Sequence, residues 1–138
     1  MSFVLDNSVT MRWCFGDGKP SELEYATKAA RTLRTDSALV PAIWALEVAN
    51  VLARGESRGE IPEDRSTAFL QLLRSMRIEA DPSTIDHALT DTLEIARKYR
   101  LSAYDAAYLE LAARQELPLA TLDQALRKAA KRAGVALF

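Results

Sequence analysis

Short apolar runs and amphipathic segments alternate along the 138 residues of this chain. The apolar runs predict strands at residues 2–5, 38–40, 77–80, 118–122 and 135–138. Between them, apolar residues recur at helical spacing, which predicts helices at residues 9–15, 21–34, 41–54, 62–76, 82–99, 102–116 and 124–132. Residues 55–61, rich in glycine and charge, are predicted to form a loop. The helix at 82–99 has a predicted inner face of Ile85, Leu89, Leu93 and Ala96.

Strands that alternate with helices in this way are typical of a parallel sheet covered on both faces. We therefore expect an α/β fold, a three-layer α/β/α sandwich with a mainly parallel central sheet of four to five short strands. Residues 1–138 are expected to form a single domain, which is long enough to bury a core. In such sheets, binding sites lie at the carboxyl ends of the strands.

Four acidic residues stand where the hydrophobic pattern calls for apolar or turn residues. Asp6 and Asp123 each follow a predicted strand, so both are expected at the carboxyl edge of the sheet. Glu47 lies on the apolar face of its helix, and Asp105 opens a helix that is mostly Ala, Leu and Tyr. No Lys or Arg lies within four positions on the same helical face of Glu47 or Asp105. Since buried carboxylates are normally paired or bound to a metal, we expect the four to converge on a divalent cation.

Each acid alone also has a structural interpretation. Asp6 could stabilise a turn, Glu47 could lie at the edge of the apolar face, and Asp123 could cap the last helix. Ser102 and Asp105 have the spacing of a capping box. The combination favours a bound cation, because two carboxylates about 4 Å apart repel by roughly 4 kcal/mol at an effective dielectric constant near 20. Ligands that are all oxygen select Mg²⁺ or Mn²⁺.

Composition narrows the functional classes. The formal net charge is −1, so nucleic-acid binding would need a local basic patch, for which Arg12, Arg54 and Arg58 are the candidates near the acids. Cys14 and His87 are the only residues of their types, which excludes an intrachain disulfide and a Cys- or His-rich zinc site. No apolar run is long enough to span a bilayer, and no secretory leader is recognisable, so a cytoplasmic protein is expected.

Four segments together resemble the PIN domain, and within it the VapC-type ribonuclease toxins of prokaryotic toxin–antitoxin pairs. They are Val4-Leu5-Asp6-Asn7-Ser8, the Leu46–Leu52 stretch LEVANVL, the Leu101–Tyr108 stretch LSAYDAAY, and Leu119-Ala120-Thr121-Leu122-Asp123. The resemblance implies that Asp6, Glu47, Asp105 and Asp123 are the catalytic acids, with Asp6, Asp105 and Asp123 as metal ligands. It also implies supporting roles for Ser8, Asn50 and Thr121.

The same resemblance implies an activity and partners. The expected activity is that of a Mg²⁺-dependent endoribonuclease, with Mn²⁺ able to substitute, which hydrolyses RNA phosphodiester bonds by a metal-activated water. The expected biological role is the toxin of a type II toxin–antitoxin system. A homodimer and an antitoxin that covers the active-site groove are implied as well, and no membrane is involved.

Two alternatives stay open at this stage. The chain could be a catalytically weak PIN-like binding module that acts through an antitoxin–DNA complex. The run from Asp6 to Thr10 also partly resembles the opening motif of haloacid-dehalogenase-type phosphatases. That motif needs a second Asp two positions after the first, where this chain has Ser8.

Overall fold

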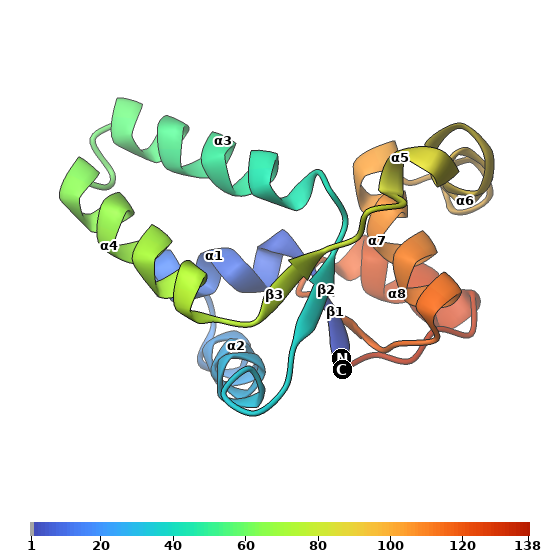
Figure 1. Ribbon diagram of the computed structural model, residues 1–138, viewed down its shortest axis with the longest axis horizontal. Helices are drawn as coiled ribbons and strands as arrows, with labels where there is room; N and C mark the ends of the chain where they lie inside the picture. Colours follow the sequence, from blue (N-terminus) through green and yellow to red (C-terminus); the bar gives the residue numbers. More distant parts are fainter. Residues whose placement is uncertain (1) are drawn as a thin grey trace.

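A four-stranded parallel sheet runs through the middle of the computed structural model, which describes residues 2–138 (Figure 1). Its strands are β1 (Phe3–Leu5), β2 (Ala38–Val40), β3 (Ile78–Ala80) and β4 (Leu119–Ala120). They lie in the order β3-β2-β1-β4, and every neighbouring pair is parallel. The chain thus builds outward on one side of β1 and returns to its other side for β4. Such a reversal leaves a crevice at the carboxyl ends of β1 and β4, where α/β proteins bind ligands.

The central strand β1 alternates its side chains between two cores. Phe3 and Leu5 pack toward α1 (Asn7–Phe15) and α2 (Pro20–Thr32). Val4 packs toward α7 (Ala103–Gln115) and α8 (Gln124–Arg132). All three side chains are fully buried, as the period-2 geometry of a strand covered on both faces requires. The predicted three-layer α/β/α fold is confirmed.

Two further helices, α3 (Trp44–Ser57) and α4 (Glu63–Ser75), form an arm to one side of the sheet (Figure 1). Their apolar residues pack with α1 in a third core cluster that includes Val48, Leu52, Phe69 and Leu73. Helix α3 continues to Ser57, so the predicted loop at 55–61 begins too early. Gly55 is buried inside this helix, and a Cβ there would meet Ile61 Cγ2 at 3.0 Å. Close packing of the turn onto the helix therefore explains the glycine better than a loop does.

The predicted helix at 82–99 is interrupted. It consists of α5 (Thr84–His87), a π-helical turn η1 (Ala88–Thr92) and α6 (Leu93–Tyr99). The prediction that Ile85 and Leu89 face inward is wrong, because they are 71% and 86% exposed. Thr84 and Thr92 are buried in their place, and the Thr84 hydroxyl accepts a hydrogen bond from the Ala42 N–H at 2.9 Å. A π turn rotates the helix faces relative to one another, which a continuous 3.6-residue pattern does not anticipate.

The C-terminal segment does not form the predicted strand at 135–138. It contributes one isolated parallel bridge between Leu119 and Leu137. The ring of Phe138 packs on that of Phe3, with centroids 4.5 Å apart. Within residues 2–138, no helix has the length and apolar character needed to cross a membrane.

Candidate active site

Asp6 lies directly after β1, at the carboxyl edge of the sheet, and its side chain is only 5% exposed. Its Oδ2 accepts hydrogen bonds from the Ser8 hydroxyl at 2.6 Å and from the Thr121 hydroxyl at 2.7 Å. The backbone N–H groups of Leu122 and Asp123 in turn donate to Ser8 Oγ and Thr121 Oγ1. Both hydroxyls are thus aimed at one oxygen of Asp6, and Oδ1 receives no side-chain donor among residues 2–138.

The environment of Asp6 disfavours its charge without a compensating cation. Burial raises the pKa of Asp6, and the hydrogen bonds from Ser8, Thr121 and the nearby backbone N–H groups only partly oppose this. Asp6 also precedes α1, whose N-terminal dipole favours a carboxylate. A bound cation would complete this neutralisation.

Glu47 lies in the first turn of α3 and is half-buried. The hydroxyl of the fully buried Tyr108, on α7, donates to its Oε1 at 2.5 Å. Burial raises the pKa of Glu47, the Tyr108 hydrogen bond opposes the rise, and the charges of Asp6 and Asp105 add to it. The alternative interpretation, that Glu47 merely lies at the edge of the apolar face, does not account for this hydrogen bond to a residue 61 positions away in the sequence.

Tyr108 is a site residue to which the sequence analysis assigns no role. A signal existed, because Tyr108 follows Asp105 by three positions, which places both on one face of α7. Burial raises the pKa of Tyr108, and the charges of Asp6 and Glu47 raise it further. The phenol therefore remains a hydrogen-bond donor.

Asp105 and Asp123 combine capping with placement at the same edge. The Asp105 N–H donates to Ser102 Oγ at 3.1 Å, and Asp123 Oδ1 accepts the Leu126 N–H at 2.8 Å, so both capping interpretations hold in part. Burial raises the pKa of Asp105, and the charges of Asp6 and Asp123 raise it further. The negative charges of Asp6 and Asp123 therefore lie close enough to Asp105 to disfavour its ionisation.

We refer to Asp6, Glu47, Asp105 and Asp123 as the rim quartet. Among residues 2–138, no Lys, Arg or His comes within 4.0 Å of any of the four carboxylates. Oxygen donors that repel one another and lack a cationic partner fit Mg²⁺ or Mn²⁺. The quartet does not form a tight cluster. Among residues 2–138, the group of potential ligand atoms that all lie within 4.8 Å of one another is a different one, formed by His87, Asp91 and Glu110. Wider spacing suits Mg²⁺, which retains several of its waters.

The other predicted site residues are less closely involved. Asn50 is exposed on α3 and makes no side-chain hydrogen bond within the described chain. Arg12 is engaged by Asp17 at 3.2 Å and lies 3.8 Å from Glu22. Arg54 is exposed on α3 and Arg58 at its end, and neither has an ion pair in residues 2–138. Ser8 and Thr121 thus hydrogen-bond to Asp6, whereas Asn50 and Arg12 make no hydrogen bond or ion pair with the four acids among residues 2–138.

A second acidic region, which the sequence did not reveal, begins at Asp81, directly after β3. Arg114 Nη2 donates to Asp81 Oδ2 at 2.6 Å, and Arg114 Nε donates to Glu110 Oε1 at 2.7 Å. His87 Nδ1 lies 2.9 Å from Asp91 Oδ2 and 3.6 Å from Glu110 Oε1. We call these five residues the Arg114 cluster. Burial alone would raise the pKa of Asp81, but hydrogen bonds from Arg114 and Ser83 and the guanidinium charge lower it.

Comparison with known proteins identifies the fold family. A family model described as PIN domain matches residues 3–132. The chain belongs to the PIN domain family. One relative, Ribonuclease VapC3 from Pyrobaculum aerophilum, is 31% identical over 126 residues, which are 91% of this chain and 92% of that protein.

Solved structures agree on the PIN fold. The crystal structure of PAE2754 from Pyrobaculum aerophilum has a TM-score of 0.66 at 20% identity, covering 94% of this chain and 86% of the other. A toxin–antitoxin complex from Klebsiella pneumoniae has a TM-score of 0.58 at 16% identity, covering 88% and 87%. The predicted resemblance to the PIN domain is confirmed.

Proposed function

We propose that this PIN domain is a Mg²⁺-dependent endoribonuclease and the toxin of a type II toxin–antitoxin pair. The observation that carries the proposal is the rim quartet. Its carboxylates lie at the switch point of the sheet, neighbouring acids help to raise the pKa values of Glu47 and Asp105, and none of the four has a cationic partner among residues 2–138. The names of the relatives support it, since one is a ribonuclease and one structure is a toxin–antitoxin complex.

Asp6, Asp105 and Asp123 would hold the ion, and Mn²⁺ would substitute for Mg²⁺. A bound divalent ion polarises the scissile phosphate and lowers the pKa of a water. Ser8 and Thr121 fix Asp6 through Oδ2, which orients the carboxylate before any ligand arrives. Such preorganisation avoids rearrangement when charge develops on the phosphate.

Glu47 would act on the attacking water. Tyr108 holds its Oε1, which leaves Oε2 to accept a proton or to orient the water for in-line attack. The products would then carry a 5′-phosphate and a 3′-hydroxyl. The phosphatase alternative is disfavoured, because Ser8 donates its hydroxyl proton to Asp6 and offers no second carboxylic acid.

Binding of RNA near these acids requires basic side chains that neutralise its phosphates. Arg54 and Arg58 are our contact candidates, since they are exposed and form no ion pair in the described part of the chain. Arg12 could contribute only by leaving Asp17 and Glu22. Replacing Arg54 or Arg58 with Met should therefore weaken RNA binding more than replacing Arg12.

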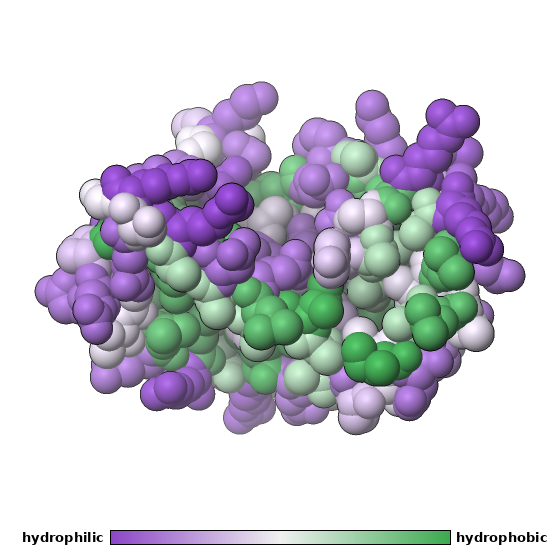
Figure 2. Space-filling model, turned by 90° about the horizontal axis from the view of Figure 1, so that it is seen from above, coloured by the Kyte–Doolittle hydropathy of each residue, from purple (hydrophilic) through white to green (hydrophobic). Residues whose placement is uncertain are grey.

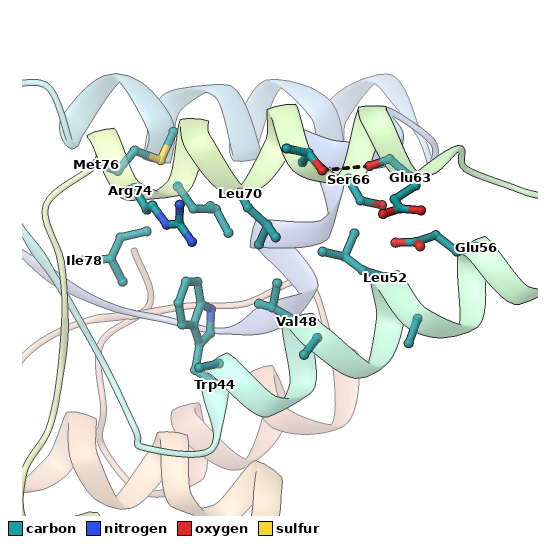
Figure 3. A pocket seen from close by; sticks show the side chains of 15 residues that line it. Trp44, Val48, Leu52, Glu56, Glu63, Ser66, Leu70, Arg74, Met76 and Ile78 are labelled. Atoms are coloured by element: carbon teal, nitrogen blue, oxygen red, sulfur yellow. Dashed lines mark hydrogen bonds between the residues drawn. The ribbon is translucent and has the colours of Figure 1, made fainter.

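We place the antitoxin in the groove between α3 and α4, a cavity of about 660 Å³ (Figure 3). Apolar side chains line its length, Glu56 and Glu63 approach one another at one end, and Arg74 points in near the other (Figure 3). The hydroxyl oxygen of Ser66, in this wall, is buried and has no hydrogen-bond partner within residues 2–138. These features fit an amphipathic helix with a basic or amide side chain toward Glu56 and Glu63 and an acidic one toward Arg74.

Charge reversal tests this docking. With the antitoxin encoded by a neighbouring small reading frame, Glu56→Lys combined with Glu63→Lys should weaken binding at least tenfold in calorimetry. Glu60→Lys, an exposed change outside the groove, is the matched control. Equal affinity of the two variants would exclude this groove as the antitoxin site.

We also propose a homodimer, held by apolar side chains that remain exposed in the single chain. Leu46, Ile85, Leu89 and Tyr104 are 64–86% exposed, and hydrophobic atoms gather over the face seen from the α3 and α5 side (Figure 2). Contiguous apolar surface of this kind marks interaction sites. Leu89→Asp should convert a dimer to a monomer in light scattering, whereas Leu72→Asp on α4 should not. A wild-type monomer at high micromolar concentration would exclude the homodimer.

The activity is tested with purified protein and cellular RNA, with Mg²⁺ or with EDTA. We expect cleavage only with Mg²⁺ and a loss of at least about a hundredfold in Asp6→Asn, since residues that merely support metal ligands already cost 10–100-fold. Asp91→Asn, an exposed change in the Arg114 cluster, should retain activity. Full activity in folded Asp6→Asn would overturn the assignment. Absence of cleavage in every sample, with intact antitoxin binding, would favour the weak binding module.

A further inference from the structure

Arg127 differs from the other basic residues of the last helix. It belongs to a basic run on α8 with Lys128, Lys131 and Arg132, all of which are exposed, whereas Arg127 is half-buried. Its side chain turns back toward β4, where Nη1 donates to the Thr121 carbonyl oxygen at 2.8 Å. Its guanidinium also lies 5.6 Å from the centre of the Tyr25 ring, within the range of a cation–π contact. Arg127 is therefore anchored rather than solvated.

The carbonyl that Arg127 holds belongs to the residue that orients Asp6. Thr121 Oγ1 accepts the Asp123 N–H at 3.1 Å, so its single proton is free to be donated to Asp6 Oδ2. Ser8 is arranged in the same way, since its Oγ accepts the Leu122 N–H and donates to the same oxygen. The conformation of residues 121–123 therefore sets the direction of both hydroxyls.

We propose that Arg127 is a positioning residue that keeps the Asp6 carboxylate oriented for a divalent ion by holding the Thr121 carbonyl. The inference rests on the proposed metal-dependent function of the rim quartet. Both hydroxyls donate to Oδ2, so Oδ1 is the Asp6 oxygen that would remain available to hold a divalent ion. Among residues 2–138, Arg127 is the one hydrogen-bond donor to the Thr121 carbonyl. Its removal therefore takes away the one hydrogen bond to the Thr121 carbonyl and leaves residues 121–123 held by their other hydrogen bonds alone.

This role is indirect. Arg127 makes no ion pair within 4.0 Å with any member of the rim quartet. Its effect on metal binding should thus pass through the geometry of Thr121, and a merely stabilising role would leave metal affinity unchanged. Partners of this kind typically contribute 10–100-fold in metal affinity or activity.

The test measures Mn²⁺ affinity of the full chain without RNA, by electron paramagnetic resonance of free Mn²⁺, together with the thermal midpoint. Arg127→Met should bind Mn²⁺ on the order of tenfold more weakly, and Arg127→Lys, which keeps a charge and a donor, should fall between it and wild type. Lys128→Met, an exposed neighbour on the same helix, should stay within about twofold of wild type. If Arg127→Met does not fold, the Arg127→Lys affinity decides in the same way.

A double-mutant cycle separates positioning from a general effect. Thr121→Val removes the hydroxyl, so adding Arg127→Met to it should weaken Mn²⁺ binding by less than about twofold more. Wild-type affinity in folded Arg127 variants, or a full tenfold additional loss in the double variant, would overturn the proposal. If the wild-type chain itself does not bind Mn²⁺, the proposed metal-dependent function fails and this inference fails with it. If the wild type binds Mn²⁺ and the folded Arg127 variants bind it equally well, only the inference about Arg127 is wrong.

Discussion

The rim quartet and the Arg114 cluster are two acidic regions of one small domain with opposite electrostatic designs. Asp6 and Asp81 each follow a strand, and each is about 95% buried. Yet the pKa of Asp6 is raised by burial, whereas burial at Asp81 is outweighed by Arg114 and the pKa falls. A region that contains its own cation is structural, and one that lacks a cation is suited to bind one.

The comparison also shows why acidic clustering alone is a poor guide to function. The Arg114 cluster contains the tightly grouped His87, Asp91 and Glu110. However, the Arg114 guanidinium already donates hydrogen bonds to both carboxylate oxygens of Glu110. The rim quartet is more open: Glu47 and Asp105 lie on α3 and α7, Asp6 directly follows β1, and Asp123 directly precedes α8. What distinguishes the metal-binding candidate is the missing counter-charge.

The largest expected effect is on the Arg114 cluster. Arg114→Met should lower the free energy of unfolding by about 3 kcal/mol, because Asp81 and Glu110 are both only 4% exposed and would lose their shared cation. Urea unfolding measures this, with Arg97→Met, an exposed change on α6, as the control. RNA cleavage per folded molecule should be retained. A loss of less than about 0.5 kcal/mol, or a loss of cleavage in folded protein, would remove the distinction between the two regions.

A smaller effect should follow from adding metal to the rim quartet. Mg²⁺ or Mn²⁺ at a hundred times its dissociation constant should raise the free energy of unfolding of the wild type by about 2.7 kcal/mol. Thermal unfolding should show this gain in Asp81→Asn, which is less stable to begin with, and not in Asp6→Asn. Stabilisation that survives in Asp6→Asn would place the ion elsewhere.

Repulsion within the rim quartet should appear when metal is withheld. In EDTA at neutral pH, Asp105→Asn should stabilise the protein by about 1 kcal/mol, because it removes a charge that neighbouring acids disfavour. The folded pKa of Asp105 is raised, so its ionisation costs stability above that pKa. The advantage of Asp105→Asn should therefore shrink as pH falls through the raised pKa toward the ordinary value of 3.8.

The opposite sign is expected at Asp81. Its folded pKa is lowered, so it contributes stability above its ordinary value of 3.8 and loses it as pH falls through the folded pKa. Urea titrations of Asp105→Asn and Asp81→Asn from pH 8 to pH 3 provide the measurement. Parallel pH profiles for the two variants would contradict the comparison.

The smallest stability effect is expected at Tyr108. Tyr108→Phe removes the donor to Glu47 Oε1 and should cost only about 0.5 kcal/mol, since the half-buried Glu47 can regain a water. Its cleavage rate should nevertheless fall roughly tenfold, as expected for a group that orients a site carboxylate. Tyr104→Phe, an exposed tyrosine on the same helix, is the matched control. Equal cleavage rates for the two variants would show that the hydrogen bond only holds α3 to α7 and does not affect cleavage.

Local pattern predicted most of the elements, and its errors have identifiable causes. The strands β1, β2 and β4 were found because each is a short apolar run bounded by polar or proline residues, and β3 was found although it contains Glu79. Ile85 and Leu89 were assigned to the wrong side because a π turn interrupts their helix. The prediction of a C-terminal strand was wrong because the backbone of this segment forms one isolated parallel bridge, to Leu119, and packs otherwise through side chains such as Phe138.

The candidate site was predictable to the extent that it depends on residue type beside an apolar run. Asp6 and Glu47 stood out in the hydrophobic pattern, and Ser8 and Thr121 followed from the family resemblance. Tyr108 and Arg127 could not be assigned roles in this way, because their contacts with Glu47 and the Thr121 carbonyl depend on how helices meet the sheet. The supporting role of Asn50 also came from the family resemblance and stays a prediction, since Asn50 is exposed and makes no side-chain hydrogen bond among residues 2–138.

The sequence by itself determined the order of strands and helices, because alternation of apolar and polar positions dictates which segments can be buried. It also excluded a metal site rich in histidine or cysteine, because the chain has one residue of each type. Only the tertiary structure decided which acids are neutralised. Asp81 meets Arg114 across 33 residues of sequence, while Asp6 meets Thr121 across 115. Whether a carboxylate is neutralised depends on which groups contact it in the folded chain. The separation of two residues in the sequence does not reveal such contacts.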